Sequence, residues 1–85
     1  MGIELVERGS NYGVNLNNKM SALFYLSDEI DGHYAISRLT FPNDPDCSGL
    51  PEIIGIVHSK SIAIKKAEEY AKTYVTELEQ RVNAA

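Results

Sequence analysis

The residues in this chain best suited to chemistry are two acids and one thiol in a single short window. The stretch FPNDPDCSGLPE, residues 41–52, holds Asp44, Asp46 and Cys47, the only cysteine, together with all three prolines. Closely spaced acids could bind a hard cation, and a thiolate beside a base could act as a nucleophile. Neither arrangement is complete, because a calcium loop needs further acids and Cys47 has no histidine near it in the sequence. Asn, Asp, Ser and Pro are typical of turns, so we expect a rigid connection without catalytic or metal-ligating residues.

The two histidines and a group of lysines are the remaining candidates. His33 follows an Asp-Gly turn and His58 ends an apolar run, and their spacing matches no metal or catalytic motif. Lys60, Lys65 and Lys66 stand near the start of a predicted helix, where basic residues oppose the helix dipole. They could form an anion-binding site there, or they could lie on a solvated face balanced by acids one turn further on. We predict no cofactor, no metal ion and no enzymatic activity.

Length and charge limit the classes of protein to consider. The 85 residues allow one domain, residues 1–85, with one hydrophobic core. Twelve acids against eight Lys and Arg residues give a net charge of −4, so we expect no direct binding to nucleic acid. No apolar run approaches the roughly 18 residues of a membrane span, and no secretory signal is evident. With a single cysteine in addition, we expect a cytoplasmic protein that does not bind membranes.

The first part of the chain has the pattern of two hairpins. Residues 3–17 should turn at Gly9-Ser10, a pair that suits a type II′ turn. This turn places Ile3 opposite Leu16, Leu5 opposite Val14 and Glu7 opposite Tyr12.

Residues 21–41 should turn at Asp31-Gly32, which suits a type I′ turn. An uninterrupted ladder places Ala22 opposite Phe41, Phe24 opposite Leu39 and Asp28 opposite Ala35. The predicted core side is Ala22, Phe24, Leu26, Ala35, Leu39 and Phe41. The residues predicted to bind a partner are Tyr25, Glu29, Tyr34, Ile36 and Arg38 on the other face, with the acid Asp28.

The last third of the chain changes to a helical period. PEIIGIVHS, residues 51–59, is a nearly continuous apolar run, which favours a strand inside the sheet. A helix is predicted from about 60 to 82, with Ser59 or Ser61 as its cap. Its apolar stripe is Ala63, Ala67, Tyr70, Ala71, Tyr74, Val75, Leu78 and Val82. The expected fold is α+β, an antiparallel sheet of four to five strands with one long C-terminal helix on one face.

The order of these segments resembles the small domain of HicB-type antitoxins. The matching pieces are SDEIDGHYAIS, FPNDPDC and SIAIKKAEEYAKTYV, within about residues 22–80, and an additional hairpin precedes them. The resemblance implies a non-enzymatic protein that neutralises a small, basic, RNA-cleaving toxin by covering its active surface.

The function expected from these features is that of an acidic, non-catalytic inhibitor. It would mask a basic or nucleic-acid-binding partner protein, in the manner of an antitoxin or of a phage inhibitor of a host defence nuclease such as an anti-CRISPR protein. One alternative is a homodimeric accessory protein of phage or mobile-element origin, with the exposed sheet face as its own interface. Another is a small-ligand-binding domain with a polar pocket near Cys47 and His58.

Overall fold

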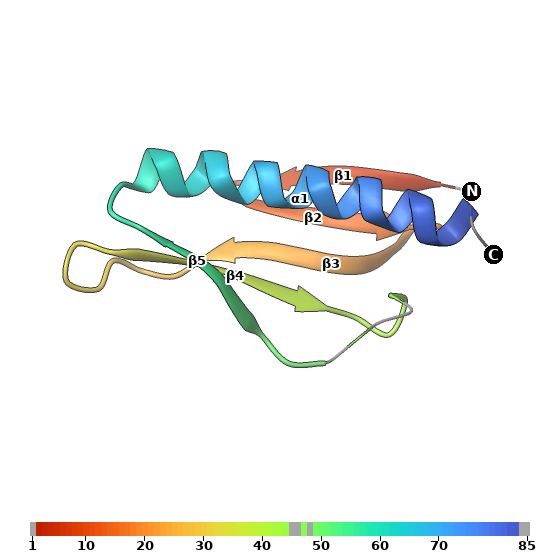
Figure 1. Ribbon diagram of the computed structural model, residues 1–85, viewed down its shortest axis with the longest axis horizontal. Coiled ribbons are helices and arrows are strands. Elements are labelled where there is room, and N and C mark those ends of the chain that lie inside the picture. Colours follow the sequence, from red (N-terminus) through yellow and green to blue (C-terminus); the bar gives the residue numbers. More distant parts are fainter. Residues whose placement is uncertain (1, 45–46, 48, 84–85) are drawn as a thin grey trace.

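The chain forms a five-stranded antiparallel sheet with one helix packed on it, which confirms the expected α+β fold (Figure 1). The computed structural model describes residues 2–44, 47 and 49–83. The strands are β1 (Ile3–Arg8), β2 (Asn11–Leu16), β3 (Lys19–Leu26), β4 (Tyr34–Thr40) and β5 (Glu52–Val57), and the helix is α1 (Lys60–Asn83). Each strand pairs with its neighbour in sequence, in the order β1-β2-β3-β4-β5. No helix in this described part combines the length and apolar character needed to cross a membrane.

The first hairpin has the predicted register. Ile3 lies opposite Leu16 and Glu7 opposite Tyr12, and Gly9 has a φ of 62°. A second tight turn, which the sequence analysis did not identify, joins β2 to β3 at Asn17-Asn18, with φ values of 53° and 67°. Asparagine tolerates this left-handed conformation better than most residues, so the Asn-Asn pair was the available signal.

The register of the second hairpin differs by one residue from the prediction. Asp31 and Gly32 both have positive φ, at 50° and 78°, as a type I′ turn requires. Beyond the turn, the Ser27 N–H donates to the Ala35 carbonyl at 2.9 Å, and the Ser27 Oγ accepts the Ala35 N–H at 2.9 Å. The Ser27 Oγ thus accepts the hydrogen bond that the Ser27 carbonyl would accept in a regular ladder. As a result, the β3 side of the hairpin has one more residue than the β4 side between the turn and this pair. The observed pairs are Ala22 with Thr40, Phe24 with Arg38 and Leu26 with Ile36.

This shift changes which residues face the helix. Ile36 is fully buried in the core between α1 and the sheet, so its prediction as a partner-binding residue was wrong. Arg38 lies on the same side of β4 as Ile36, because alternate residues share a face. Ala35 and Leu39, predicted as core, lie on the uncovered face instead.

Helix α1 agrees closely with the prediction. It begins at Lys60 after Ser59, whose Oγ accepts the Ile62 N–H at 3.5 Å. Its buried residues are Ala63, Ala67, Ala71, Tyr74 and Leu78. They pack on the core residues of the sheet, Tyr12, Val14, Leu16, Ala22, Phe24 and Ile36. Three small alanines allow the helix to approach the sheet closely, while Tyr74 supplies bulk near the C-terminal end.

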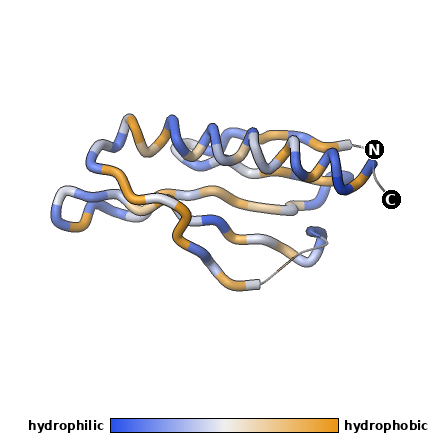
Figure 2. Tube along the Cα trace, in the orientation of Figure 1, coloured by the Kyte–Doolittle hydropathy of each residue, from blue (hydrophilic) through white to orange (hydrophobic). Residues whose placement is uncertain are grey.

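Strand β5 is an edge strand, and the prediction that it lies inside the sheet was wrong. Ile53 and Ile56 are each 63% exposed. Figure 2 shows hydrophobic residues along most of β5, and Figure 1 shows the far ends of β4 and β5 lying away from the helix. An uninterrupted apolar run does not distinguish a central strand from an edge strand with exposed apolar side chains.

Candidate functional site

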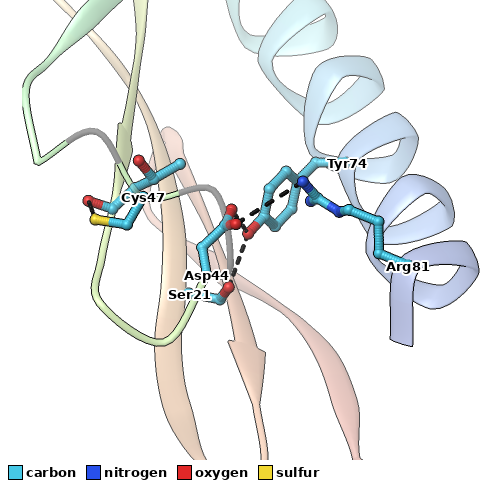
Figure 3. Close-up of polar contacts among 6 residues, drawn as sticks. Ser21, Asp44, Cys47, Tyr74 and Arg81 are labelled. Atoms are coloured by element: carbon cyan, nitrogen blue, oxygen red, sulfur yellow. Dashed lines mark hydrogen bonds and ion pairs between the residues drawn. The ribbon is translucent and has the colours of Figure 1, made fainter. Parts of the chain in front are cut away.

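A buried polar cluster joins α1 to the window 41–52. We call Ser21, Asp44, Tyr74 and Arg81 the Asp44 cluster (Figure 3). The Tyr74 hydroxyl donates to the Asp44 carboxylate, and the Ser21 Oγ lies 2.7 Å from the Tyr74 Oη. The Arg81 Nη1 is 3.8 Å from Asp44 Oδ1. Ser21 is the extra residue of a bulge in β3, which directs its side chain to the helix.

Burial governs the protonation of this cluster. Asp44 is only 3% exposed, so its carboxylate does not lie on the surface where a partner could reach it. Desolvation raises the pKa of the Tyr74 hydroxyl well above its usual range, and the hydrogen bond to Asp44 adds to this effect. Tyr74 therefore remains a proton donor at neutral pH, and the cluster has a structural role in attaching the helix to the loop.

The described part of the window forms backbone turn hydrogen bonds, from the Asp44 N–H to the Phe41 carbonyl at 2.8 Å and from the Cys47 N–H to the Asp44 carbonyl at 3.1 Å. The side chains of Asn43 and Cys47 bond to other segments. The Asn43 Nδ2 donates to the carbonyls of Leu16 at 2.7 Å and Lys19 at 3.2 Å. The Cys47 Sγ donates to the Thr40 carbonyl at 3.4 Å. Cys47 is thereby placed at one end of β4, far from both histidines, which lie at the other end. Asp46, the other acid of the window, lies outside the described residues.

A small polar pocket of about 130 Å³ lies beside the Asp44 cluster. Its lining is Arg38, Thr40, Asp44, Leu50, Glu52, Tyr74 and Arg81. Two arginines face two acids within it, and the Arg38 Nη2 is 3.1 Å from the Glu52 Oε1 on the adjacent strand. Neither Cys47 nor His58 is part of this lining, so the pocket is not the ligand site expected between them. Its charges are matched within the protein, which favours a structural role.

A larger, shallow hollow lies at the tip of the β3–β4 hairpin. Its volume is about 450 Å³, and it is lined by Ser27, Ile30, Asp31, His33, Ala35 and Ile56. Ile30 is 66% exposed and Ile56 63% exposed, and the neighbouring acids Asp28, Glu29 and Asp31 are also exposed. We define the hairpin patch as Ile30, Ala35 and Ile56 with three border acids. Asp31 lines the same hollow, whereas Asp28 and Glu29 precede Ile30 in the hairpin and line a second hollow with Tyr34 and Lys60.

The two histidines lie together beside this patch. Their rings are 4.2 Å apart between centroids, at an angle of 53°. The contact continues the β4–β5 register in which Tyr34 lies opposite Val57. The His33 Nδ1 is also 2.8 Å from the Asp31 carbonyl, which holds this ring against the turn. The contact between the two histidines could not be predicted from the sequence, because it depends on the β4–β5 pairing.

The remaining predicted partner-binding residues are distributed between two faces. Tyr25 lies opposite Ser37 on the uncovered face and is partly buried. Tyr34 lies on the helix side, where its hydroxyl donates to the Glu29 carboxylate at 3.3 Å. Desolvation, and then the negative charge of Glu29, raises the pKa of the Tyr34 hydroxyl. Only Asp28 and Glu29 of the predicted set belong to the hairpin patch.

The three lysines suggested for anion binding lie on different sides of helix α1. Since each residue turns the helix by ~100°, Lys65 and Lys66 lie ~140° and ~240° around the axis from Lys60. Lys66 pairs with Glu69 at 3.8 Å, and Lys60 lines a second hollow together with Asp28 and Glu29.

Among the described residues, no group of three or more His, Cys, Asp or Glu side chains is arranged to hold a metal ion.

Comparisons of the chain with models of protein families, with curated proteins and with solved structures found no match.

Proposed function

We propose that this chain is a non-catalytic inhibitor that docks on a basic, nucleic-acid-handling protein through the hairpin patch. The observation that carries the proposal is the combination of an apolar centre with an acidic border. Ile30 and Ile56 expose most of their side chains, and three acids follow or precede Ile30 within the same hairpin. Exposed apolar groups of this size bordered by charge are typical of protein-binding surfaces.

The two parts of the patch have different roles in binding. Burial of Ile30 and Ile56 against an apolar spot on the partner supplies affinity, because it removes apolar surface from water. The border acids Asp28, Glu29 and Asp31 favour a partner whose surrounding residues are basic, and they repel acidic proteins. Lys60 lies in the hollow beside Asp28 and Glu29, so it lowers the local negative charge without reversing it.

The overall charge supports the same class of partner. A chain with a net charge of −4 is drawn to cationic surfaces and is repelled by the phosphates of nucleic acids. Proteins that bind or cut nucleic acid carry such cationic surfaces, and a small acidic domain seated there blocks access of the substrate. Small RNA-cleaving toxins are the members of this class implied by the resemblance to HicB-type antitoxins, and host defence nucleases are the second candidate.

The residues proposed for docking now differ from those expected from the sequence. Ile36 is in the core and Arg38 is paired with Glu52, so neither is offered to a partner. Ile30 and Ile56 take their place, while Asp28 and Glu29 remain. Tyr34 is not part of the patch, and its hydrogen bond holds the Glu29 carboxylate on the helix side of the hairpin.

The test uses capture from a lysate of the cells that carry the gene, followed by assay of the purified partner. We expect the wild-type chain to retain a basic protein, and to inhibit its nucleic-acid binding or cleavage when both are pure. Reversing two border charges with Asp28→Lys and Glu29→Lys should abolish both effects, and high salt should weaken capture. The matched control is Glu77→Lys with Glu79→Lys, which makes the same charge change on exposed positions of α1.

Three results would contradict the proposal. The first is a captured partner whose nucleic-acid activity the chain leaves unchanged. The second is retention that the control reversal reduces as much as the border reversal does. The third is a partner of acidic surface whose retention does not respond to salt.

A further inference from the structure

Strand β5 has an unpaired and nearly uncharged outer edge. The sheet ends at β5, and within the described part of the chain no strand pairs with its outer side. The opposite edge, β1, carries exposed Glu4, Glu7 and Arg8 in six residues, whereas the six residues of β5 carry only Glu52. Charges are one of the means by which edge strands avoid pairing with another chain. In charge, the two edges are therefore protected unequally, and β5 is the one whose side chains least oppose a further strand. The bulge at Ile54 limits such pairing to a short stretch.

A bulge arranges the exposed isoleucines of β5 on one face. Ile53 lies opposite Ser37 and Ile56 opposite Ala35, so both point to the uncovered face of the sheet. Residues three apart on a regular strand point to opposite faces. Here Ile54 is an extra residue in the pairing with β4, and it brings Ile53 and Ile56 to the same side. The result is two exposed isoleucines beside an open ladder of backbone donors and acceptors.

We infer that β5 pairs antiparallel with β5 of a second copy of this chain, which joins the two sheets into one. A two-fold axis between Ile54 and Gly55 places Ile53 opposite Ile56 of the partner subunit, and the symmetry gives the same pair twice. In this register, both exposed isoleucines of each strand meet an isoleucine on the same face of the sheet. Residues opposite each other in an antiparallel pair are close enough for such side chains to pack.

Charge does not fix the direction of this pairing. Glu52 lies opposite Arg38, with which it forms an ion pair, and Lys60 lies beside Asp28 and Glu29. The antiparallel direction follows from the two-fold symmetry, which places each exposed isoleucine opposite another.

The area available to this contact sets its strength. A junction of two six-residue strands buries less than the roughly 1,600 Å² of a typical stable interface, so the dimer should be weak. We expect a dissociation constant of roughly 1–100 µM, and hence a monomer–dimer equilibrium in solution.

This inference does not depend on the proposed function. Ile56 belongs to both surfaces, so a bound partner and a second copy would compete for it, whereas Ile53 belongs only to the β5 edge and Ile30 only to the hairpin patch. A wild-type chain that binds its partner but never dimerises overturns only the inference. A wild-type chain that dimerises but binds no partner overturns only the proposed function.

The first test is sedimentation equilibrium from about 0.1 to about 500 µM, a range chosen to span the expected dissociation constant. The wild-type mass should rise from 9.4 kDa towards twice that value. Ile53→Lys should raise the dissociation constant at least about 100-fold, because the symmetry places two lysines against isoleucines. Ile30→Lys is the matched control, since Ile30 is equally exposed, and it should leave the dimer unchanged. Circular dichroism confirms that both variants are folded.

The second test reports the register directly. In a Cys47→Ser background, two single variants, Ile53→Cys and Ile56→Cys, are oxidised separately and as a mixture. The mixture should form a covalent dimer much faster than either variant alone, because the register places residue 53 opposite residue 56.

Several results would overturn the inference. One is a protein that stays monomeric over the whole concentration range. Another is a dimer that survives Ile53→Lys or is lost with Ile30→Lys. A third is a single cysteine variant that cross-links with itself as fast as the mixture does.

Discussion

The Tyr74 hydroxyl donates a hydrogen bond to the Asp44 carboxylate, joining the helix to a loop 30 residues earlier in the chain. Both side chains are buried, and Ser21 and Arg81 complete their surroundings. A buried carboxylate requires such partners, because desolvation of its charge is costly unless hydrogen bonds compensate. The contact therefore holds the first part of the window 41–52, at Asp44, at a fixed place under the C-terminal half of α1.

We predict that the loss of this buried hydrogen bond lowers stability more than the loss of a hydroxyl at a less buried position. Tyr74→Phe should lower the free energy of unfolding by about 2 kcal/mol, because the buried Asp44 carboxylate loses a donor. Urea denaturation followed by circular dichroism measures this change. Tyr70→Phe is the matched control, one turn earlier on the same helix and less buried, and it should cost well under half as much. The double variant with Asp44→Asn should show a coupling of about 1 kcal/mol or more, and additive losses would contradict the assignment.

The pH dependence of stability follows from the same tyrosine. Burial raises the pKa of folded Tyr74 above its ordinary value of 10.0. The stabilisation is complete below pH 10, where both states are protonated, and it is lost as pH rises towards the folded pKa. Above pH 10 the unfolded chain releases a proton that the folded chain keeps, so this residue lowers stability by about 1.4 kcal/mol per pH unit. Tyr12 and Tyr34 act in the same direction.

Denaturation at pH 9, 10 and 11 in wild type and in Tyr74→Phe isolates this contribution, since pH 10 is the ordinary tyrosine pKa. Above pH 10, the unfolding free energy of the wild type should fall more steeply with pH than that of the variant. The difference in slope should correspond to the release of about one proton on unfolding. Equal slopes in the wild type and the variant would mean that the pKa of Tyr74 is the same in the folded and unfolded states.

The sequence predicted local structure better than it predicted which face was buried. The helix, the first hairpin and both Gly-containing turns follow from short-range patterns, and all are confirmed. The register of β3 and β4 does not follow from the Asp31-Gly32 turn alone, because the Ser27 side chain enters the ladder and moves Ile36 into the core. A side-chain oxygen that replaces a carbonyl leaves no periodic signal.

The candidate site shows the same limit. Asp28 and Glu29 were identified because charge near a turn is visible in the sequence. Ile30 and Ile56 were missed. The exposure of Ile56 depends on β5 being the last strand of the sheet and on the bulge at Ile54, and Ile30 lies beside the turn, where it pairs only with His33. The order of strands is a long-range property that a single apolar run cannot indicate.

Cys47 should prove dispensable. Its Sγ donates one weak hydrogen bond to the Thr40 carbonyl, and a serine hydroxyl can donate the same bond. We therefore expect Cys47→Ser to change the free energy of unfolding by less than about 1 kcal/mol and to leave partner inhibition intact. The measurement is denaturation together with the inhibition assay. A folded variant that had lost inhibition would place chemistry at this thiol.

Ser27 should set the register of the second hairpin. Ser27→Ala removes the oxygen that accepts the Ala35 N–H, and this partly buried donor then has to find water or another acceptor. We expect a loss of about 1 kcal/mol in unfolding free energy, with faster hydrogen exchange at the Ala35 amide. Ser27→Thr keeps the oxygen and should retain most of the protection. If the alanine variant instead gained the uninterrupted ladder, Ile36 would leave the core and Leu39 would enter it. Cross-strand nuclear Overhauser contacts of Phe24, to residue 38 or to residue 39, distinguish these two registers directly.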